Sequence, residues 1–311
     1  MDDDIKVSVI IPTRNGGQYL GQLFEILRDQ SIRLSQILVV DSSSQDNTLK
    51  ICKNFSVDII EIEARNFDHG GTRNLAASRA TGDIIVFMTQ DALFREAGCL
   101  ENLIKPLDDS TIAASYGRQM PKEDANPVER FVRSFNYPSK GMIKDIDDLP
   151  RLGVKTFFFS NACSAINKGT FEKVDGFPEK TIMNEDMFLA AKLLQKGYKI
   201  AYQPDAAVYH SHNYSLAIQF KRYFDIGVFF NRNRWIKNVT RSEREGIRYL
   251  KEEIGYLFAN GKRRWIPYAL VDSTVRFLGY RVGLLERSLP LSIKKKMSFN
   301  KGFWEHHVSS A

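Results

Sequence analysis

Short apolar runs alternate with longer amphipathic segments over the first 95 residues. Four runs have the length and composition of buried β-strands: residues 7–12, 37–40, 57–62 and 84–88. Between the strands, apolar side chains recur at helical spacing in three segments: residues 18–30, 47–54 and 71–80. Strands that alternate with helices predict parallel βαβ units, with helices on both faces of the sheet of an α/β protein.

The pattern is less regular after residue 91. We predict strands at residues 112–116, 156–159 and 207–209 and a helix at residues 184–196. Residues 121–152 form an irregular, proline-containing stretch, which predicts a long functional loop with one helix. Because helical spacing returns beyond residue 215, we expect an α/β domain over residues 1–215 and a helical appendage over residues 216–311.

Composition narrows the class of protein. With 311 residues, 43% apolar and 26% charged, the chain is typical of a soluble globular protein. No uncharged apolar run approaches the ~20 residues that a transmembrane helix needs. The acidic start Met1–Asp4 is unlike a signal peptide. Cys52, Cys99 and Cys163 lack metal-site spacing, so we expect buried thiols in a reducing, cytoplasmic compartment.

The net charge of +7 is unevenly distributed. From residue 215 to the end there are 19 Lys+Arg and 8 Asp+Glu, against 25 and 29 in the rest of the chain. A basic tail on a slightly acidic body predicts an anionic partner, either a membrane or nucleic acid. We do not expect nucleic acid, because the aromatic side chains of the tail follow helical packing and no recognised nucleic-acid motif is present.

Asp91 comes three residues after the apolar run at residues 84–88. A buried strand that stops at an acid places that acid at the carboxyl edge of the sheet, where open α/β folds bind ligands. A carboxylate at this edge typically holds a cation, and a cation beside a nucleotide offsets phosphate charge. An acid that caps a helix or a turn gives the same pattern, so Asp91 alone leaves both interpretations open.

The first two strands end in a similar way. The first ends at Pro12 and is followed by Thr13, Arg14 and Asn15, and the second ends at Asp41. Two such ends form a crevice, in which the Asp41 carboxylate can accept from the imide N–H of uracil or thymine or from a ribose hydroxyl. Ordinary βα-turn chemistry uses the same residue types. The Gly-x-Gly-x-x-Gly fingerprint of dinucleotide sites is absent.

His210 and His212 follow the predicted strand at residues 207–209. Imidazole and carboxylate are both normal ligands of divalent metals, so a histidine here is a candidate ligand beside Asp91. In an extended segment the two side chains point to opposite faces, so we expect only one of them to reach the metal and favour His210. A structural role for the histidines is the alternative.

Three further charged residues lie in the first turns of predicted helices. Arg73 can brace a phosphate or fix the Asp91 loop, or it can form a surface salt bridge. In the structural interpretation, Glu185 and Asp186 are acids in the first turn of a helix, where the helix macrodipole stabilises negative charge. Their functional interpretation is a general base that deprotonates an acceptor hydroxyl, while the neighbouring acid is held by hydrogen bonds.

Taken together, these segments resemble the family 2 glycosyltransferases, which have the GT-A type of fold. The resemblance covers roughly residues 6–215 and rests on Val-Ser-Val-Ile-Ile-Pro-Thr-Arg-Asn at the start, Asp41, Arg73-Asn74, Asp91 and Asn184-Glu185-Asp186. It implies that Asp41 binds the base and that Asp91 binds the diphosphate and a divalent cation, Mg²⁺ or Mn²⁺. It also implies that Asp186, with Glu185 beside it, is the catalytic base of a single displacement that inverts the anomeric centre.

The chain departs from the family at its Asp-x-Asp motif, where Thr89-Gln90-Asp91 keeps only the last acid. The first sugar or metal contact is then weakened or made by Thr89, which suits a sugar that lacks a hydroxyl or a looser metal dependence. The resemblance implies a nucleotide-binding half over about residues 1–95 and an acceptor half over about residues 96–215. We assign ten residues to nucleotide-sugar binding: Pro12, Thr13, Arg14, Asn15, Asp41, Arg73, Thr89, Gln90, Asp91 and Arg118.

Several segments resemble the rhamnosyltransferase branch of this family. They are Phe67-Asp68-His69-Gly70-Gly71-Thr72-Arg73-Asn74, Thr89-Gln90-Asp91-Ala92, Tyr116-Gly117-Arg118-Gln119, Phe135-Asn136-Tyr137-Pro138, Phe159-Ser160-Asn161-Ala162 and His210-Ser211-His212-Asn213-Tyr214-Ser215. The branch implies dTDP-L-rhamnose as donor and a lipid-linked saccharide of a bacterial surface polysaccharide, such as an O-antigen, as acceptor. A 6-deoxy sugar is consistent with the reduced acidic motif.

The basic tail is consistent with a lipid-linked acceptor. Its cations are Arg222, Arg232, Arg234, Lys262, Arg263, Arg264 and Lys294–Lys296, and they alternate with Tyr223, Phe229, Phe230, Trp235, Trp265, Phe277 and Trp304. An amphipathic, basic and aromatic surface can lie on the anionic inner face of the cell membrane. Helices that pack on the body or form a homo-oligomer are the alternative.

Two other functions stay open. One is a catalytically idle nucleotide-sugar-binding or scaffold subunit, because the first acid of the metal motif is missing. The other is a UDP-sugar-dependent transferase of the same family, because the sequence does not separate thymine from uracil donors.

Overall fold

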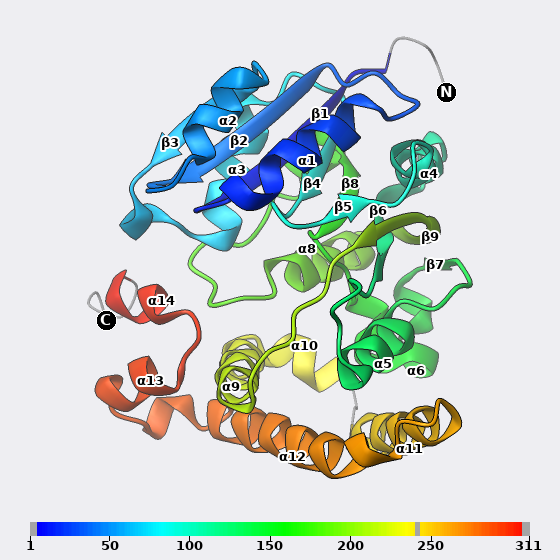
Figure 1. Ribbon diagram of the computed structural model, residues 1–311, viewed down its shortest axis with the longest axis vertical. Helices are drawn as coiled ribbons and strands as arrows, with labels where there is room; N and C mark the ends of the chain where they lie inside the picture. The colour runs from blue at the N-terminus through cyan, green and yellow to red at the C-terminus, as the bar shows by residue number, and fades with distance from the viewer. Residues whose placement is uncertain (1–4, 240–242, 307–311) are drawn as a thin grey trace.

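A mixed sheet runs through the molecule, with apolar clusters and helices on both of its faces (Figure 1). The computed structural model describes residues 5–239 and 243–306, so the acidic start Met1–Asp4 lies outside the described residues. The strands are β1 (Val7–Thr13), β2 (Gln36–Ser42), β3 (Asp58–Ile62), β4 (Ile84–Met88), β5 (Leu93–Phe94), β6 (Ile112–Met120), β7 (Met142–Lys144), β8 (Cys163–Asn167) and β9 (Lys199–Tyr209). Their order is β3-β2-β1-β4-β8-β6-β9-β5, and β7 pairs with β9.

The helices divide between those that cover the sheet and a layer formed by the last third of the chain (Figure 1). The former are α1 (Gly17–Arg28), α2 (Thr48–Asn54), α3 (His69–Arg79), α4 (Cys99–Ile104), α5 (Pro127–Asn136), α6 (Leu149–Leu152), α7 (Lys168–Lys173) and α8 (Glu185–Gln195). The latter are α9 (Leu216–Arg232), α10 (Arg234–Val239), α11 (Glu243–Ala259), α12 (Ile266–Gly283), α13 (Leu291–Met297) and α14 (Lys301–His306).

The N-terminal half has the predicted parallel βαβ arrangement. Strands β1 to β4 pair in parallel, and β1 lies between β2 and β4. Ile10 belongs to the apolar cluster on one face of the sheet, and Val9 and Ile11 belong to the cluster on the other. Burial on both faces explains the long apolar runs of β1, β2 and β4, whereas the edge strand β3 is partly exposed and carries Asp58 and Glu61. The carboxyl ends of β1, β2 and β4 therefore meet at one edge.

The predicted strand at residues 156–159 is wrong. This segment is the end of a 3₁₀ helix, Gly153–Phe157, and an irregular stretch after it. The strand is β8, which pairs antiparallel with both β4 and β6. Phe157 and Phe159 are buried without strand geometry, and a short apolar run does not reveal its backbone conformation.

Two other segments are more ordered than expected. The region predicted as a long loop, residues 121–152, contains α5, β7 and α6. The predicted strand at residues 207–209 is the end of the eleven-residue β9. Its polar sequence Gln203-Pro204-Asp205 sits where the register with β6 shifts, and that irregularity hid the earlier half of the strand.

The C-terminal helices share a core with the sheet. Phe224, Phe229 and Trp304 are buried in the same apolar cluster as Phe87 of β4. Helix α12 packs closely on α9, since a Cβ on Gly283 would lie 2.1 Å from the carbonyl oxygen of Phe224. Phe229, Phe230 and Trp304 are buried, so for these three aromatic residues the alternative of packing on the body is correct and the lipid-facing surface is wrong. Helical spacing of aromatic residues is equally typical of a helix that packs on a core.

Within the described part of the chain, none of the helices combines the length and the apolar character needed to cross a membrane. Cys52, Cys99 and Cys163 are free and buried, as predicted. Burial raises the pKa of the Cys52 thiol to about 11, so this side chain acts as a small apolar group.

Candidate active site

A cavity of about 740 Å³ opens at the carboxyl edge of the parallel strands. One wall comes from the ends of β1, β2 and β4, a second from the start of α3, and a third from the C-terminal segment that includes α14. Six of the ten residues assigned to nucleotide-sugar binding line it: Pro12, Thr13, Arg14, Arg73, Thr89 and Gln90. The cavity thus lies where an open α/β sheet binds its ligands.

Gln90 joins the ends of β1 and β4. Its Oε1 accepts hydrogen bonds from the Thr13 hydroxyl and from the Arg14 amide at 3.0 Å. Its Nε2 donates to the Arg14 carbonyl at 3.3 Å. The amide of Gln90 therefore fixes the loop after β1 and shapes the cavity wall.

Asp41 and Asn15 hold the adjoining loops. Asp41 is buried beside Thr13, and its Oδ2 accepts from the Ser44 amide at 2.9 Å, which is the predicted turn chemistry. Asn15 has a positive φ of 50° and accepts at Oδ1 from the Gln45 amide at 2.9 Å. Asn tolerates this left-handed conformation better than most residues. Neither side chain lines the cavity, so both act first as supports of its rim.

Several buried polar atoms around the cavity have no hydrogen-bond partner among the described residues. They are Asp41 Oδ1, Ser42 Oγ, Arg73 Nε and Thr89 Oγ1. Buried polar atoms are almost always paired, and an unpaired group costs about 1–3 kcal/mol. Three of these atoms belong to residues that line the cavity, which indicates that a polar ligand completes this site.

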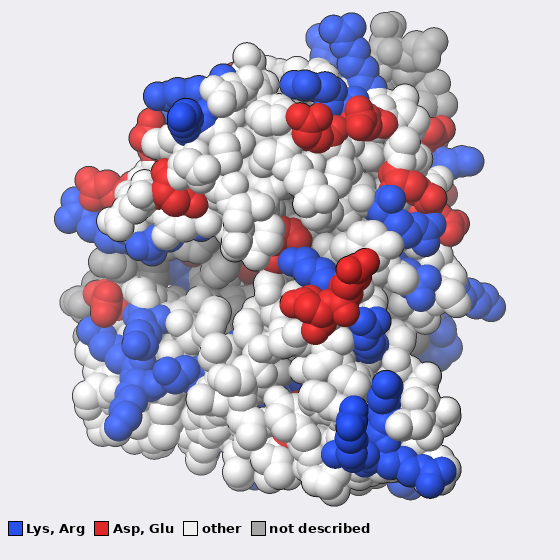
Figure 2. Space-filling view, in the orientation of Figure 1, with Lys and Arg blue, Asp and Glu red and all other residues white. Residues whose placement is uncertain are grey.

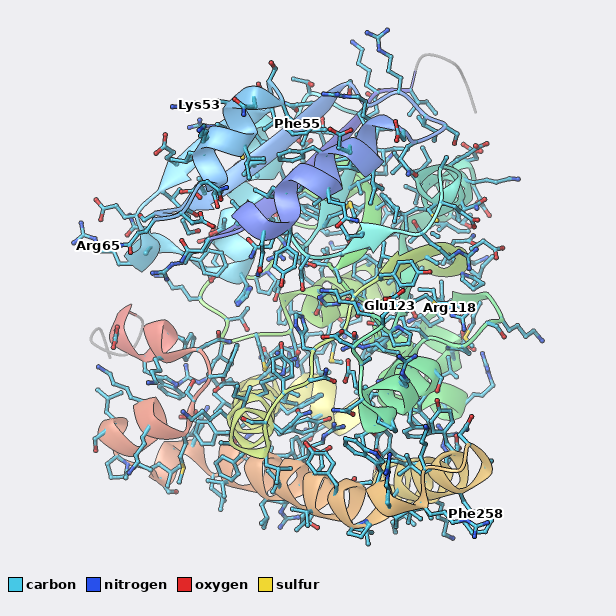
Figure 3. The ribbon with its side chains drawn as sticks, in the orientation of Figure 1. Lys53, Phe55, Arg65, Arg118, Glu123 and Phe258 are labelled. Carbon is cyan, nitrogen blue, oxygen red and sulfur yellow. The ribbon has the colours of Figure 1, made fainter. Side chains whose placement is uncertain are left out.

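Arg118 lies elsewhere. It projects from β6 and donates from Nε to the Tyr137 carbonyl at 3.1 Å. In projection it is well separated from α14, which forms a wall of the cavity (Figures 1 and 3). The assignment of Arg118 to nucleotide-sugar binding receives no support from this placement.

Asp91, His210 and His212 form a compact cluster. The Asp91 carboxylate is 3.4 Å from His210 Nε2, 3.3 Å from His212 Nε2 and 3.5 Å from Lys122 Nζ. The expectation that only one imidazole reaches this point is wrong, because β9 ends at Tyr209 and strand alternation does not apply beyond it.

The protonation of this cluster suits a cation. Burial raises the pKa of Asp91, but the hydrogen bond and charge of His210, with His212 and Lys122, outweigh burial and hold it well below its usual range. Burial lowers the pKa of His210 and lowers that of His212 to about 4. Near neutral pH the group is therefore one carboxylate and two neutral imidazoles.

A second layer of side chains orients His210. Gln119 Oε1 lies 2.9 Å from His210 Nδ1 and also accepts from Arg133, while Gln119 Nε2 donates to the Ser160 hydroxyl at 2.8 Å. Because Oε1 only accepts, His210 must donate from Nδ1, and in the neutral ring the Nε2 lone pair is then available to a cation beside Asp91.

The donor atoms of Asp91, His210 and His212 lie within 4.8 Å of one another. A carboxylate and neutral imidazoles are a normal donor set for a divalent transition metal. The residues present therefore fit the metal that the resemblance implies, with His212 added to the expected pair.

Glu185 and Asp186 point to different partners. Glu185 is buried, receives a hydrogen bond from Asn161 Nδ2 at 3.2 Å and lies 3.3 Å from the Arg73 guanidinium. Arg73 is itself 4% exposed, so this pair is not the surface salt bridge considered above. Burial raises the pKa of Glu185, but the charges of Arg73 and His69 and the hydrogen bonds to the carboxylate together outweigh burial and lower the pKa overall.

Asp186 has no such counter-charge. Its oxygens accept from the backbone amides of Met187 at 2.7 Å and Asn161 at 3.4 Å. Burial and the adjacent charge of Glu185 raise the pKa of Asp186 to about 7. This is the range in which a carboxylate serves best as a general base near neutral pH.

The α3 motif positions the loop that carries this pair. Asn74 donates to the Phe177 carbonyl at 3.0 Å and accepts from the Phe177 amide at 2.9 Å. Gly70 must lack a side chain, because a Cβ there would lie 2.0 Å from the Pro178 carbonyl oxygen. Asn184, with a φ of 59°, then starts α8. The Arg73-Asn74 pair therefore supports the acidic pair, a role that the sequence did not suggest.

Asn161 and its neighbours connect the two clusters. Ser160 accepts from Gln119 of the histidine network, and Asn161 contacts both Glu185 and Asp186. The carbonyl of Ala162 accepts from the Thr89 amide at 3.4 Å. Asn161 was missed as a site residue, although its segment was singled out as part of the branch resemblance.

Comparisons with known proteins show the family of this chain. The family model described as "Glycosyl transferase family 2" matches residues 8–175. The chain belongs to glycosyl transferase family 2. Two relatives cover nearly its full length. The O-antigen chain rhamnosyltransferase RfbN of Salmonella typhimurium strain LT2 is 42% identical over 97% of each chain, and WbaN of Salmonella anatum is 43% identical over 96% of each. The family predicted from the sequence is confirmed.

The fold is also confirmed as the GT-A type. A mannosyltransferase from Pyrobaculum calidifontis, solved with GDP-Man and Mn²⁺, superposes with a TM-score of 0.58 at 18% identity, over 98% of this chain and 86% of that one. S. aureus TarS, solved with UDP-GlcNAc, gives a TM-score of 0.53 at 16% identity, over 91% and 92%. At such low identity these likenesses concern the fold of this transferase and not its substrates.

Proposed function

We propose that this glycosyltransferase transfers L-rhamnose from dTDP-L-rhamnose to a hydroxyl of a lipid-linked bacterial surface glycan, with inversion at the anomeric carbon. The observation that carries the proposal is the identity of 42% and 43% to two O-antigen chain rhamnosyltransferases over at least 96% of the chain. The cavity, with its unpaired polar atoms, supplies room for the nucleotide sugar.

Asp186 is the catalytic base of the proposed reaction. It takes the proton of the acceptor hydroxyl while that oxygen bonds to the anomeric carbon and the bond from this carbon to the diphosphate oxygen breaks. Asn161 and the Met187 amide hold the carboxylate in place. Glu185, paired with Arg73, keeps the pKa of Asp186 raised. The nucleoside diphosphate leaves with the bonding electrons, so charge and atoms balance.

Asp91, His210 and His212 would hold a divalent cation. When bound, such a cation supplies positive charge that offsets the departing diphosphate. Two imidazoles favour Mn²⁺ over Mg²⁺, because Mg²⁺ prefers oxygen ligands throughout. Thr89, whose hydroxyl is buried and unpaired among the described residues, takes the place of the first acid of the motif.

Donor selectivity tests this proposal. Purified protein is incubated with Mn²⁺, with dTDP-L-rhamnose, UDP-sugars or GDP-sugars, and with lipid-linked saccharides extracted from cells that lack the enzyme. We expect rhamnosyl transfer from the dTDP donor. Preference for a GDP-sugar would contradict the donor assignment, and donor binding without transfer or hydrolysis would favour the idle-subunit alternative.

The proposed acceptor carries a lipid, and α12 offers a surface for the membrane. Its inner face packs on α9 through Gly279 and Gly283, and Ala269 packs with Val128 of α5 and Leu257 of α11. Its outer face continues into the following turn and exposes large apolar side chains: Leu270, Val271, Phe277, Leu278 and Leu285. Such an apolar stripe on a helix surface is typical of a helix that lies on a bilayer.

Basic side chains flank this stripe. Figure 2 shows Lys and Arg gathered at both lower corners of the molecule, over the junction of α11 and α12 and over α13 and α14. Lys262, Arg263 and Arg264 lie at the first of these places, and Phe258 beside them is 54% exposed and points outward (Figure 3). Near an anionic bilayer each cation contributes about 1 kcal/mol. The proposed location is therefore the inner face of the cytoplasmic membrane.

Vesicle binding tests this surface. The protein is sedimented with vesicles containing phosphatidylglycerol, beside vesicles of phosphatidylcholine alone. We expect binding to the anionic vesicles, and loss of that binding in a Phe277→Glu, Leu278→Glu variant. A dimer that dissociates in the same variant, with no vesicle binding by the original protein, would show that a second copy covers this face instead.

A further inference from the structure

The C-terminal end of the chain forms one wall of the cavity. We define the C-terminal strap as residues 298–305, the link between α13 and α14 together with most of α14. Six of its members line the cavity: Phe299, Asn300, Lys301, Gly302, Phe303 and Glu305. They share the cavity with the distant ends of β1, β2 and β4, and neither the sequence pattern nor the family model, which ends at residue 175, reaches them.

Asp225 of α9 anchors the strap. This carboxylate is fully buried and accepts three hydrogen bonds from the strap, from the Ser298 hydroxyl at 2.7 Å, the Phe299 amide at 3.0 Å and the Asn300 amide at 2.9 Å. A buried acceptor with three donors in consecutive residues fixes a backbone as firmly as a helix cap does. These hydrogen bonds therefore hold the strap in place although it does not belong to the sheet.

Two further contacts fix the strap at its ends. Asn300 Nδ2 donates to the Ile182 carbonyl at 2.7 Å, in the loop that leads to Glu185 and Asp186. At the other end Trp304 is fully buried, and the Arg232 guanidinium lies 5.3 Å from its ring. Lys301 is exposed between these two anchors.

The start of the strap lies close to the cluster of Asp91. The Tyr214 ring stacks on His212 at 5.1 Å and meets the Phe299 ring at 6.4 Å. Arg222 lies over both Tyr214 and Phe299, at 4.6 and 5.8 Å. Lys301, two residues beyond Phe299, lines the same cavity as Arg14 and Arg65.

We infer that the C-terminal strap is part of the nucleotide-sugar site and that the Lys301 ammonium binds the diphosphate of the donor. The inference rests on the proposed function, because it takes the cavity as the donor site. Three arginines also line the cavity, Arg14, Arg65 and Arg73; of these, Arg73 is paired with Glu185 and Arg65 with Glu63. Lys301 projects from a wall that Asp225 holds, so little further backbone freedom is lost when its ammonium binds a phosphate. Asp225 is a positioning residue, and Lys301 is the ligand-binding residue.

Binding of dTDP and of thymidine to Lys301→Met tests the role of the ammonium. By calorimetry with Mn²⁺ present, we expect dTDP to bind about tenfold more weakly than to the original protein, a typical loss for one charged hydrogen bond. Thymidine, which lacks phosphates, should raise the melting temperature of both proteins equally. Lys301→Arg should restore most of the dTDP affinity. The matched control is Lys53→Met, which removes an equally exposed cation on α2, far from α14 (Figure 3).

Hydrogen–deuterium exchange tests the strap itself. We expect dTDP to slow exchange of the amides of residues 298–305, and Asp225→Asn to speed exchange at Phe299 and Asn300 while the strands of the sheet stay protected. If Lys301→Met binds dTDP as tightly as the original protein, or if dTDP leaves the strap amides unchanged, the inference is overturned. If the original protein binds no dTDP at all, the proposed donor is wrong, which is a different result.

Discussion

Two aspartates at the site occupy opposite electrostatic environments. Asp91 has two imidazoles and the Lys122 ammonium within 3.5 Å, and its pKa lies well below the usual range. Asp186 has an anionic neighbour, Glu185, and its pKa is raised to about 7. The same side chain is therefore a permanent anion in one place and a proton acceptor in the other, because its neighbours differ.

Arg73 maintains this difference. A guanidinium close to both acids of the α8 pair could have kept both ionised, but its ion pair is with Glu185 at 3.3 Å. Asp186 is left with backbone amides as partners. Because Arg73 pairs with Glu185 and not with Asp186, these adjacent residues have different proton affinities, and acid–base catalysis uses such a difference.

The largest expected effect is loss of the proton acceptor. Asp186→Asn removes the basic oxygen but keeps the shape, so transfer should fall by about 10²–10⁴-fold, the usual contribution of a general base. Binding of dTDP should be unchanged, since Asp186 does not line the cavity. Rates of transfer and calorimetric titration with dTDP measure the two quantities. Retained turnover would remove Asp186 from this role.

Asp91→Asn removes the charge of the aspartate that remains ionised, the one beside the two histidines. An amide cannot supply the charge that a cation needs, so the response of activity to Mn²⁺ should disappear and the donor should bind on the order of 10²-fold more weakly. Titration of Mn²⁺ into the apo-protein, followed by its melting temperature, checks metal binding without catalysis. An unchanged response to Mn²⁺ would place the cation elsewhere.

The sequence predicted the parts of this site that lie at strand ends. Asp41 ends an apolar run and Asp91 follows another after two residues, and the parallel order of β1, β2 and β4 brings them to one edge. Here chain order and sheet geometry together determine the location of the residues. Local periodicity was sufficient for the same reason: these strands are buried on both faces, so their apolar runs are unbroken.

The remaining features depend on contacts between distant segments. His212 turns toward Asp91 only because the chain leaves β9 at Tyr209, and Arg73 pairs with a residue that lies 112 positions later. The strap meets the cavity through Asp225, which looks like any polar position on an amphipathic helix. Arg118 was assigned from a motif alone, and its side chain instead supports the Tyr137 backbone. Such pairings carry no local signal in one sequence.

Gln119→Leu should have an intermediate effect on the metal cluster. The side chain orients His210 and fixes its tautomer without touching the proposed cation position. Loss of such a partner typically weakens metal binding 10–100-fold. We therefore expect a lower affinity for Mn²⁺ and normal activity when Mn²⁺ is saturating. If saturating Mn²⁺ does not restore the rate, Gln119 has a role beyond orienting the histidine.

Glu185→Gln should change the pH dependence more than the rate. The groups that face Asp186 are Glu185, Arg73 and Tyr137. Since the negative charge of Glu185 raises the pKa of Asp186, a neutral glutamine lowers it, and the now uncompensated charge of Arg73 acts in the same direction. Asp186 is the active base only above its pKa, so the original enzyme should lose activity as the pH falls through about 7. In Glu185→Gln this limb of the pH–rate profile should move to lower pH by about one unit, with little change at pH 8. A limb that stays in place would mean that burial alone, and not the charge of Glu185, sets the basicity of Asp186.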